Sequence, residues 1–364
     1  MNKLLICTQE MNSQSSTLAF FVRWVTKLAP HYDHITVICL YQGNYSLPAN
    51  VTVLSLGKEN HVADAPLGFV QKSLLRLQYI ARFYYYILKE HRNYNKVFIH
   101  MNDEYGVLGG LWWRLFGKKM YLWRNHYAGH RSTRWVGALC EKVFYTSAFS
   151  YTAKKEYFPQ GVQMPVGVDV ESLETDEVFT VPPRSLLFLA RLDPSKKPEI
   201  VLDALALLKD RGCAYTMDFV GGTSKDKWPH YEAEVKAYKE KLGLGAPVQF
   251  IGAVPSTDTY KYYLSHEVYI NVSQSGMLDK TIFKALAAGC IPITSSVDFN
   301  AMIKPATNDR LLVKENDAVS LADTITYVLY LPDTEKKNLV REMQALVIGK
   351  HSLDVLAKKI SELV

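Results

Sequence analysis

Two lysines that stand one helical turn apart, Lys280 and Lys284, are the first candidates for chemistry. They lie in residues 275–290, which read SGMLDKTIFKALAAGC, near the start of an expected helix whose dipole disfavours cations. Like charges at this spacing cost about 0.2–0.5 kcal/mol. Gly276, just before the helix, leaves backbone N–H groups open to an anion, and an anion there would relieve both lysines. The alternative is a solvated helix face that tolerates them.

A second cationic cluster follows the predicted strand SLLFLAR. The strand delivers Arg191, and the turn LDPSKK delivers Lys196 and Lys197 ahead of the next helix. Arginine binds phosphate through two parallel hydrogen bonds and lysine binds it as a point charge, so this turn could hold a phosphate. A solvated turn is the other interpretation. Further along, the strand in FVGG ends in Gly221 and Gly222, which let a backbone or a ligand approach closely.

Two histidines close predicted strands of the first half. His100 ends KVFIH and His126 follows MYLWRN, each at the carboxyl end of a strand, where a ligand cleft is expected. A histidine in this position could hydrogen-bond a sugar or move a proton. A single histidine is more often structural, so both interpretations stay open.

The composition indicates a globular protein of two domains. The chain has 364 residues, of which 48% are apolar and 21% charged, enough for two cores. Its apolar runs are shorter than the roughly 18 to 20 residues of a spanning helix, and MNKLLICTQEMN is too short for a signal peptide, so we expect a cytoplasmic protein. Five cysteines without CxxC or Cys/His ligand spacing are predicted to be buried thiols, with no metal or disulfide: Cys7, Cys39, Cys140, Cys213 and Cys290.

The net charge of +6 is unevenly distributed. Residues 1–170 contain 19 Lys/Arg and 10 Asp/Glu, a balance of +9, and the remainder contains 23 and 26, a balance of −3. PLGFVQKSLLRLQYIARFYYYILKEHR is basic and aromatic with no acid before Glu90, and GGLWWRLFGKK repeats that chemistry. These segments predict contact with an anionic membrane, the alternative being an interior helix with a broad apolar face. Helix-turn-helix, zinc and RNP-like patterns are missing, so no nucleic-acid partner is predicted.

Short β-branched and aromatic runs alternate with helical patterns along the chain. This alternation predicts an α/β fold with parallel sheets wound by crossover helices. The two sheets would face a central ligand cleft at their carboxyl ends. The predicted parts are a Rossmann-like domain at 1–168, a linker at 169–184 that includes ESLETDEVFTVPPR, a second Rossmann-like domain at 185–348, and a C-terminal helix at 349–364 that packs back on the first domain.

The second domain resembles that of the retaining GT-B glycosyltransferases of family 4, also called glycosyl transferases group 1. The matching motifs occur in family order: RLDPSKK, FVGG, VQFIGAV, HEVYINVSQSG and LDKTIFKALAAGCIPITS, after a fainter match in MPVGVDVESLE. In the first domain, LWRNHYAGH and VFYTSAFSYTAKKEYF match more loosely, and TQEMNSQSS replaces the paired glycines that often follow the first strand. The resemblance implies a GT-B fold with an acceptor-binding first domain and a donor-binding second domain.

By this resemblance the donor is a nucleoside diphosphate sugar, the acceptor is a glycan or lipid-linked molecule, and no metal or other cofactor is required. The anomeric configuration is retained, and the leaving diphosphate is stabilised electrostatically. The implied catalytic residues are His126, which touches the donor sugar, and Arg191 and Lys196, which hold the diphosphate. The acceptor or sugar side is assigned to His100, Asn102 and His130. The implied donor-binding residues are Gly221, Gly222, Gly252, Ala253, Val254, Gly276, Met277, Leu278, Asp279, Lys280, Thr281 and Lys284.

One position departs from the family pattern. The family usually has two glutamates eight positions apart, the second on the ribose hydroxyls, but here these positions hold Gly276 and Lys284. A lysine has no acceptor for a hydroxyl proton. Lys284 binds phosphates or an acidic group of an unusual donor, or another residue holds the ribose, or catalysis is lost. The prediction is therefore an active glycosyltransferase of cell-envelope polysaccharide or glycoconjugate synthesis at the inner face of the membrane, with a non-catalytic protein that binds nucleotide sugar or glycan as the alternative.

Overall fold

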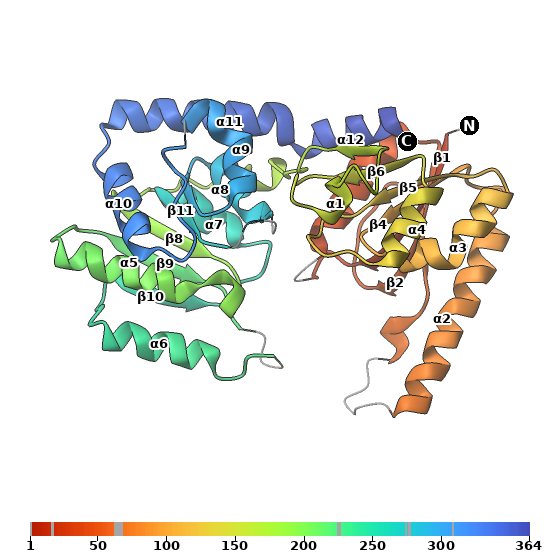
Figure 1. The fold of residues 1–364 in the computed structure, drawn as a ribbon, viewed down its shortest axis with the longest axis horizontal. Helices are drawn as coiled ribbons and strands as arrows, with labels where there is room; N and C mark the ends of the chain where they lie inside the picture. Colours follow the sequence, from red (N-terminus) through yellow and green to blue (C-terminus); the bar gives the residue numbers. More distant parts are fainter. Residues whose placement is uncertain are drawn as a thin grey trace. The chain divides into compact units, whose positions relative to one another are not determined.

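The computed structural model describes residues 2–15, 18–61, 68–223, 227–273, 275, 278–307 and 309–364. The chain forms two compact units (Figure 1): Met1–Gly167 together with Leu353–Val364, and Val168–Ser352. The predicted linker, 169–184, belongs to the second unit. Both units contain a parallel sheet with helices, which confirms the predicted α/β fold class.

The first unit is built on a seven-stranded sheet with the order β3-β2-β1-β4-β5-β6-β7, in which every neighbouring pair is parallel. Six of its strands coincide with the β-branched and aromatic runs of the sequence, and the short β7 adds to the edge. The strands are β1 (Lys3–Met11), β2 (His34–Gln42), β3 (Val51–Ser55), β4 (Lys96–His100), β5 (Lys119–Trp123), β6 (Lys142–Tyr145) and β7 (Gly161–Gln163).

Helices cover both faces of this sheet, because alternate strand residues point to opposite sides. Phe98 belongs to a core with α1 and α12, whereas Val97 belongs to a core with α2, α3 and α4. Leu356 of α12 is fully buried in the first of these cores, and Nζ of Lys27 lies 2.9 Å from Oδ1 of Asp354. The helices are α1 (Ala19–Leu28), α2 (Phe69–Lys89), α3 (Glu104–Leu115), α4 (Arg131–Leu139) and α12 (Leu353–Leu363).

The second unit has a five-stranded parallel sheet with the order β10-β9-β8-β11-β12. β8 leads to β9 and β10 on one side, and β11 and β12 lie on its other side, so the strand order reverses between β8 and β11. In an open α/β sheet this switch point is where ligands bind. The strands are β8 (Ser185–Leu189), β9 (Thr216–Val220), β10 (Val248–Gly252), β11 (Val268–Asn271) and β12 (Ile291–Thr294).

The helices of the second unit fill the connections between these strands and then form the helical segment that ends the unit (Figure 1). α5 contacts α10, and α11 contacts α8 and α9. These helices are α5 (Pro198–Asp210), α6 (Tyr231–Lys241), α7 (Thr259–Leu264), α8 (Lys280–Ala288), α9 (Val297–Thr307), α10 (Ala318–Leu329) and α11 (Asp333–His351).

The cysteines are free thiols, four of them buried and Cys213 half-buried. Burial first, and then the charge of Glu59, raise the pKa of the Cys39 thiol to about 12. A thiol held in this state is a poor nucleophile and a poor metal ligand. The prediction of buried thiols is confirmed for Cys7, Cys39, Cys140 and Cys290.

Candidate functional site

The carboxyl ends of β8 and β11 bring the two cationic segments of the sequence together. β8 leads to Arg191 and to a 3-10 helix at Pro194–Lys196, whereas β11 leads to the start of α8. The two strands are neighbours in the sheet. Residues that are distant in the sequence therefore meet at the switch point of the second unit.

Lys196 and Asp279 form the central ion pair of this site. Nζ of Lys196 lies 2.6 Å from Oδ2 of Asp279 and donates to Oγ of Ser273 at 3.2 Å. Oδ1 of Asp279 accepts the Thr281 backbone N–H at 3.2 Å, so Asp279 is the N-cap of α8. Burial acts to raise the pKa of the Asp279 carboxyl, but Lys196 and the hydrogen bonds from Thr281 outweigh it and hold that pKa below its usual range.

β11 supplies two side chains beside this ion pair. The buried Tyr269 hydroxyl donates to the carbonyl oxygen of Leu189 at 3.0 Å and lies 2.7 Å from Oγ1 of Thr281. Nδ2 of Asn271 donates to Oδ2 of Asp279 at 3.3 Å. Tyr269 therefore connects the end of β8 with the first turn of α8. Sequence reasoning missed both residues, although both lie inside the motif HEVYINVSQSG. Tyrosine is common in strands, whereas asparagine is depleted there, so the residue type of Asn271 was a signal that could have found it.

Arg191 differs from Lys196 in how firmly it is held. Its side chain is 63% exposed, and its Nη2 lies 3.7 Å from Oδ2 of Asp193, longer than a good hydrogen bond. Asp193 caps the 3-10 helix that follows, since its Oδ1 accepts the Ser195 backbone N–H at 3.0 Å. Lys196 is thus a fixed cation of the site and Arg191 an exposed one.

Gly221 and Gly222 allow neighbouring backbone segments to approach each other closely. Gly221 has φ +137, and a Cβ atom added to it would lie 1.9 Å from the carbonyl oxygen of Ala190. Its N–H donates to the Gly252 carbonyl at 2.8 Å, and the Leu192 N–H donates to the Gly222 carbonyl at 3.1 Å. These bonds join the segments that follow β8 and β9 with the end of β10. A contact of these glycines with a donor stays a prediction.

Lys280 and Lys284 are both half-buried in α8. Burial first, and then the charge of Lys284, lower the pKa of Lys280 to about 7. Burial also lowers the pKa of Lys284, whereas the carboxylate of Asp169 opposes that shift. Lys284 therefore has an anion in its surroundings in the second unit, at the position where the family pattern has a glutamate.

Glu315 is a further charged residue that the sequence did not point to. Its Oε1 accepts the Ser275 backbone N–H at 2.9 Å. Hydrogen bonds from Ser275, helped by the charge of Lys197, hold the pKa of Glu315 below its usual range. Glu315 reaches this position because Leu312 forms a parallel bridge with Thr294 at the end of β12. No sequence signal indicated this bridge between Leu312 and Thr294, because Leu312 lies outside the predicted strands.

The other residues predicted to bind the donor are Gly252, Ala253, Val254, Gly276, Met277 and Leu278. Gly276 and Met277 lie outside the residues that the structure describes. Leu278 directly precedes the cap residue Asp279 and is half-buried. Gly252 has φ +86 and ends β10, followed by the exposed Ala253 and the half-buried Val254. These last three residues stand at the carboxyl edge of the sheet.

His100 and His126, the two histidines predicted at strand ends, lie in different environments. His100 is only 2% exposed; its Nδ1 lies 3.1 Å from Oγ1 of Thr8, and its ring stacks on Phe21 at 3.8 Å between centroids. This core position argues against its predicted contact with a sugar. His126 is exposed, and its Nδ1 lies 3.0 Å from the Ala128 backbone nitrogen.

His130 and Asn102 are at the surface of the first unit. His130 precedes α4, and its N–H donates to Oγ1 of Thr133 at 3.3 Å. Nδ2 of Asn102 donates to Oε2 of Glu104 at 3.0 Å. Their predicted role toward an acceptor or sugar is compatible with these positions and stays a prediction.

A polar network that the sequence did not indicate holds the segment before His126. Oδ1 of Asn125 accepts the backbone N–H of Ser147 at 3.2 Å and the hydroxyl of Ser150 at 2.6 Å. Nη2 of the mostly buried Arg124 donates to the Ala128 carbonyl at 3.0 Å. Both ends of the loop that carries His126 are therefore fixed. The sequence signal that could have found Asn125 is its place in LWRNHYAGH, the motif that matches the family loosely.

Comparison with known proteins agrees with the fold. Residues 171–345 match the family model described as glycosyl transferases group 1. No curated protein matches the chain. Three similar solved structures each align with nearly the whole chain but share little sequence, so they show the fold alone.

The first is HepE from Anabaena in complex with UDP, with 16% identity, a TM-score of 0.73, and coverage of 99% of this chain and 98% of that one. A glycosyltransferase from Rickettsia africae has 18% identity, a TM-score of 0.71, and coverage of 100% and 98%. A TarM variant from S. aureus in complex with fondaparinux, alpha-GlcNAc-glycerol and UDP has 11% identity, a TM-score of 0.71, and coverage of 100% and 99%. The chain therefore has the GT-B fold.

Proposed function

We propose, because residues 171–345 match the family model of glycosyl transferases group 1, that the chain transfers a sugar from a nucleoside diphosphate sugar to a glycan or lipid-linked acceptor, with retention of the anomeric configuration and without a metal. The observation that carries this proposal is the Lys196–Asp279 pair at the start of α8. The similar proteins whose complexes contain UDP support a uridine diphosphate donor as the first to test.

The proposed chemistry is electrostatic. When the bond between the sugar and the diphosphate breaks, negative charge accumulates on the diphosphate, and preorganised cations stabilise it. Lys196 is held in place by Asp279 and Ser273, so it loses little freedom on binding. The exposed Arg191 is assigned to close on the outer oxygens of the diphosphate, because a guanidinium can hold two of them at once.

We assign Lys284 to the donor as well. Its ammonium cannot accept a bond from a ribose hydroxyl, but it can bind a phosphate or an acidic group of the donor. The Asp169 carboxylate counters part of the cost of holding this charge in a half-buried place. We further assign the reaction to cell-envelope polysaccharide or glycoconjugate synthesis, and His126 to the donor sugar.

A thermal-shift screen of nucleoside diphosphate sugars in the presence of a chelator tests the proposal, followed by hydrolysis and transfer assays on the best binder. We expect stabilisation and turnover, both lost in Arg191→Ala. The matched control is Arg211→Ala, which removes another surface arginine, 2.9 Å from Asp323 in the same unit. Stabilisation without turnover with varied acceptors would favour the non-catalytic alternative, and no stabilisation by any donor would overturn the site assignment.

A further inference from the structure

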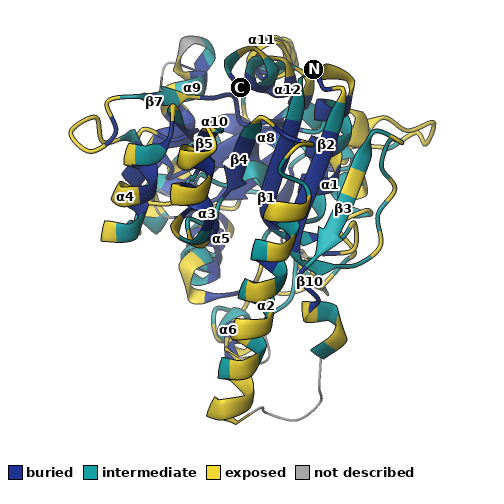
Figure 2. Ribbon diagram, turned by 90° about the vertical axis from the view of Figure 1, so that its right-hand side faces the viewer, coloured by how far each residue is buried: buried dark blue, intermediate teal, exposed yellow. Residues whose placement is uncertain are grey.

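The outward side of α2 presents an apolar stripe to solvent. Leu74 and Leu77 are 60% and 62% exposed, whereas Phe83 and Ile87 on the opposite side are buried in the core. In Figure 2 most of α2 is coloured as exposed. A spacing of three and four residues places side chains on one face of a helix. The members of the stripe are Val70, Leu74, Leu77, Ala81, Tyr85 and Leu88.

Helix α3 extends this apolar surface. The Tyr84 hydroxyl donates to the Leu108 carbonyl at 2.9 Å, so α2 and α3 are adjacent. The rings of Trp112 and Phe116 stack at 5.2 Å between centroids. The exposed apolar residues of α3 and its end are Val107, Leu111, Trp112, Leu115 and Phe116.

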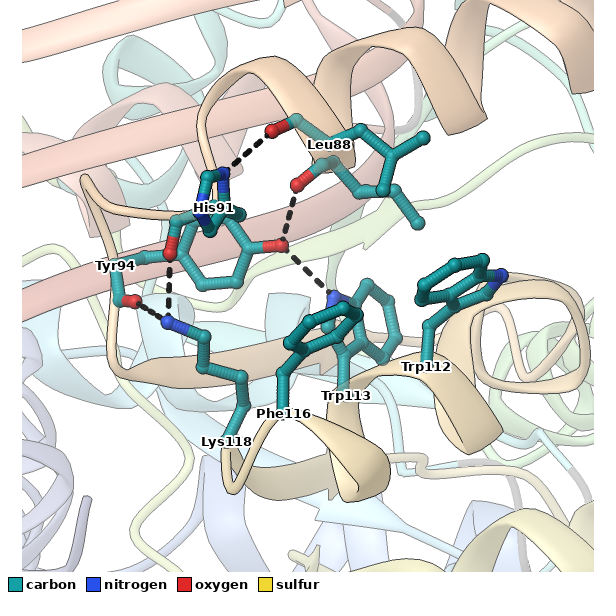
Figure 3. Close-up of a pocket in the computed structure, with 8 residues that line it drawn as sticks. Leu88, His91, Tyr94, Trp112, Trp113, Phe116 and Lys118 are labelled. Atoms are coloured by element: carbon teal, nitrogen blue, oxygen red, sulfur yellow. Dashed lines mark hydrogen bonds between the residues drawn. The ribbon is translucent and has the colours of Figure 1, made fainter.

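A small cavity joins the two helices where both end (Figure 3). It has a volume of about 170 Å³ and a mostly apolar lining that includes Leu88, Trp112 and Phe116. Its polar groups bond within the protein: Lys118 Nζ donates to the carbonyl oxygens of His91 and Tyr94, each at 2.6 Å. The open side of the cavity therefore offers apolar contact rather than hydrogen bonds.

The charge of this region has one sign. Residues 69–89 contain four Lys/Arg and no Asp or Glu, and residues 105–140 contain six Lys/Arg and no Asp or Glu. The acids next to these ranges are Glu90 and Glu104, which accept hydrogen bonds from neighbouring asparagines, and Glu141, which directly follows the second range. The exposed cations of the two helices are Lys72, Arg76, Lys89 and Arg114.

We infer that the α2–α3 face, defined by the exposed apolar residues and cations above, docks on an anionic lipid bilayer. An apolar helix face with aromatic residues and with cations on its other sides is the pattern of helices that lie in the membrane interface, and anionic headgroups attract the cations. In the part of the chain that the structure describes, no helix is long and apolar enough to cross a bilayer.

The charge and the apolar character of this face together favour a bilayer over a second copy of the chain and over a nucleic acid. A second copy of the chain would bring the same cationic face to a symmetric interface, where like charges repel. A nucleic acid would satisfy the cations but would leave the exposed leucines without an apolar partner. A bilayer with anionic headgroups satisfies both kinds of residue at once.

Vesicle flotation of the full chain, without donor or acceptor, tests this inference. The vesicles are phosphatidylcholine alone and phosphatidylcholine mixed with phosphatidylglycerol. We expect flotation with the anionic vesicles that weakens at high salt. The test variant is Leu77→Glu with Leu111→Glu, and the matched control is Val178→Glu with Val319→Glu, which changes two exposed apolar residues of the second unit.

The expected loss in the test variant is at least about tenfold in partitioning, since each leucine leaves the apolar layer, and the control should bind like the wild type. Changing Lys72 and Arg76 to Gln should lower binding to anionic vesicles by about fivefold for each cation. No flotation with anionic vesicles, or equal flotation of the test variant, would overturn the inference, as would a dimer that the leucine changes dissociate. Because no sugar is transferred in this assay, a failure of the proposed function leaves its result unaffected.

Discussion

Oδ2 of Asp279 lies 2.6 Å from Nζ of Lys196, while Oδ1 of the same carboxylate caps α8. One side chain therefore fixes both the cation and the helix N-terminus, the two groups that would meet a diphosphate. A phosphate that approaches Lys196 shares it with Asp279, because an ammonium has three N–H donors. This arrangement holds Lys196 and the N-terminus of α8 in place ahead of the proposed donor.

The Lys196→Met variant should lose about a hundredfold in kcat/KM for transfer, because a preorganised cation on the leaving group is removed. Steady-state kinetics with the donor found by thermal shift checks this. The matched control is Lys236→Met, which removes a lysine of a surface ion pair with Glu232 in the same unit. Equal losses in the two variants would show that Lys196 has no specific role.

The lowered pKa of Lys280, about 7, predicts how donor binding responds to pH. A diphosphate beside Lys280 favours its charged form, so binding above pH 7 should take up a proton, and affinity should fall as the pH rises from 7 toward the ordinary lysine pKa. Calorimetry at pH 8 in buffers with different ionisation enthalpies measures this uptake. Lys280→Gln should remove it, and an unchanged uptake in that variant would assign the proton elsewhere.

The same shift predicts the effect of Lys280 on stability. Its folded pKa lies below its unfolded pKa, so between about pH 7 and 10 the unfolded chain holds a proton at this residue that the folded chain lacks. The contribution of Lys280 to the free energy of unfolding is therefore smallest below pH 7 and increases as the pH rises through this window. Urea unfolding of the wild type and of Lys280→Gln across this range isolates the contribution as the difference between the two curves.

Reversing the charge at Lys284 tests its assignment to the donor. Lys284→Glu should lose donor binding, but it also places two carboxylates near each other, because Asp169 lies in the surroundings of Lys284. The double variant Asp169→Asn with Lys284→Glu removes that repulsion and should still fail to bind, which a thermal shift with the donor will show. Tighter binding of a common uridine diphosphate sugar by the double variant would mean that the lysine is not a donor ligand.

Gly221→Ala should lower the free energy of unfolding by about 2 kcal/mol or more, because its backbone is in a region that side chains avoid and its Cβ would meet the Ala190 carbonyl. Denaturant unfolding measures the change. Gly245→Ala is the control, since a Cβ there meets no atom within 4 Å, and its effect should be close to zero. Equal stability of the two variants would contradict the close approach described here.

The sequence predicted the architecture well, because the alternation of strand and helix patterns is a local signal. Residue types at strand ends also selected Arg191 and Lys196, whereas Asp279 was named only through the family resemblance. The Lys196–Asp279 bond itself depends on β8 and β11 being neighbours, which no local pattern states. Glu315 was missed for the same reason.

The position of His100 at a strand end did not reveal the direction of its side chain. It stands at the carboxyl end of β4, as predicted, but its side chain points into the core beside Phe21. The strand alternation offered a clue, because Phe98 and His100 have the same parity and therefore face the same side of the sheet. Phe98 belongs to the core with α1 and α12.

The return of the chain to the first unit has a consequence for the order of events during synthesis. α12 follows the whole second unit in the chain, yet its Leu356 and Ile360 are fully buried in the core of the first unit. During synthesis on the ribosome, part of the apolar core of the first unit stays uncovered until α12 emerges. The second unit, which is continuous from Val168 to Ser352, can fold before the first is complete.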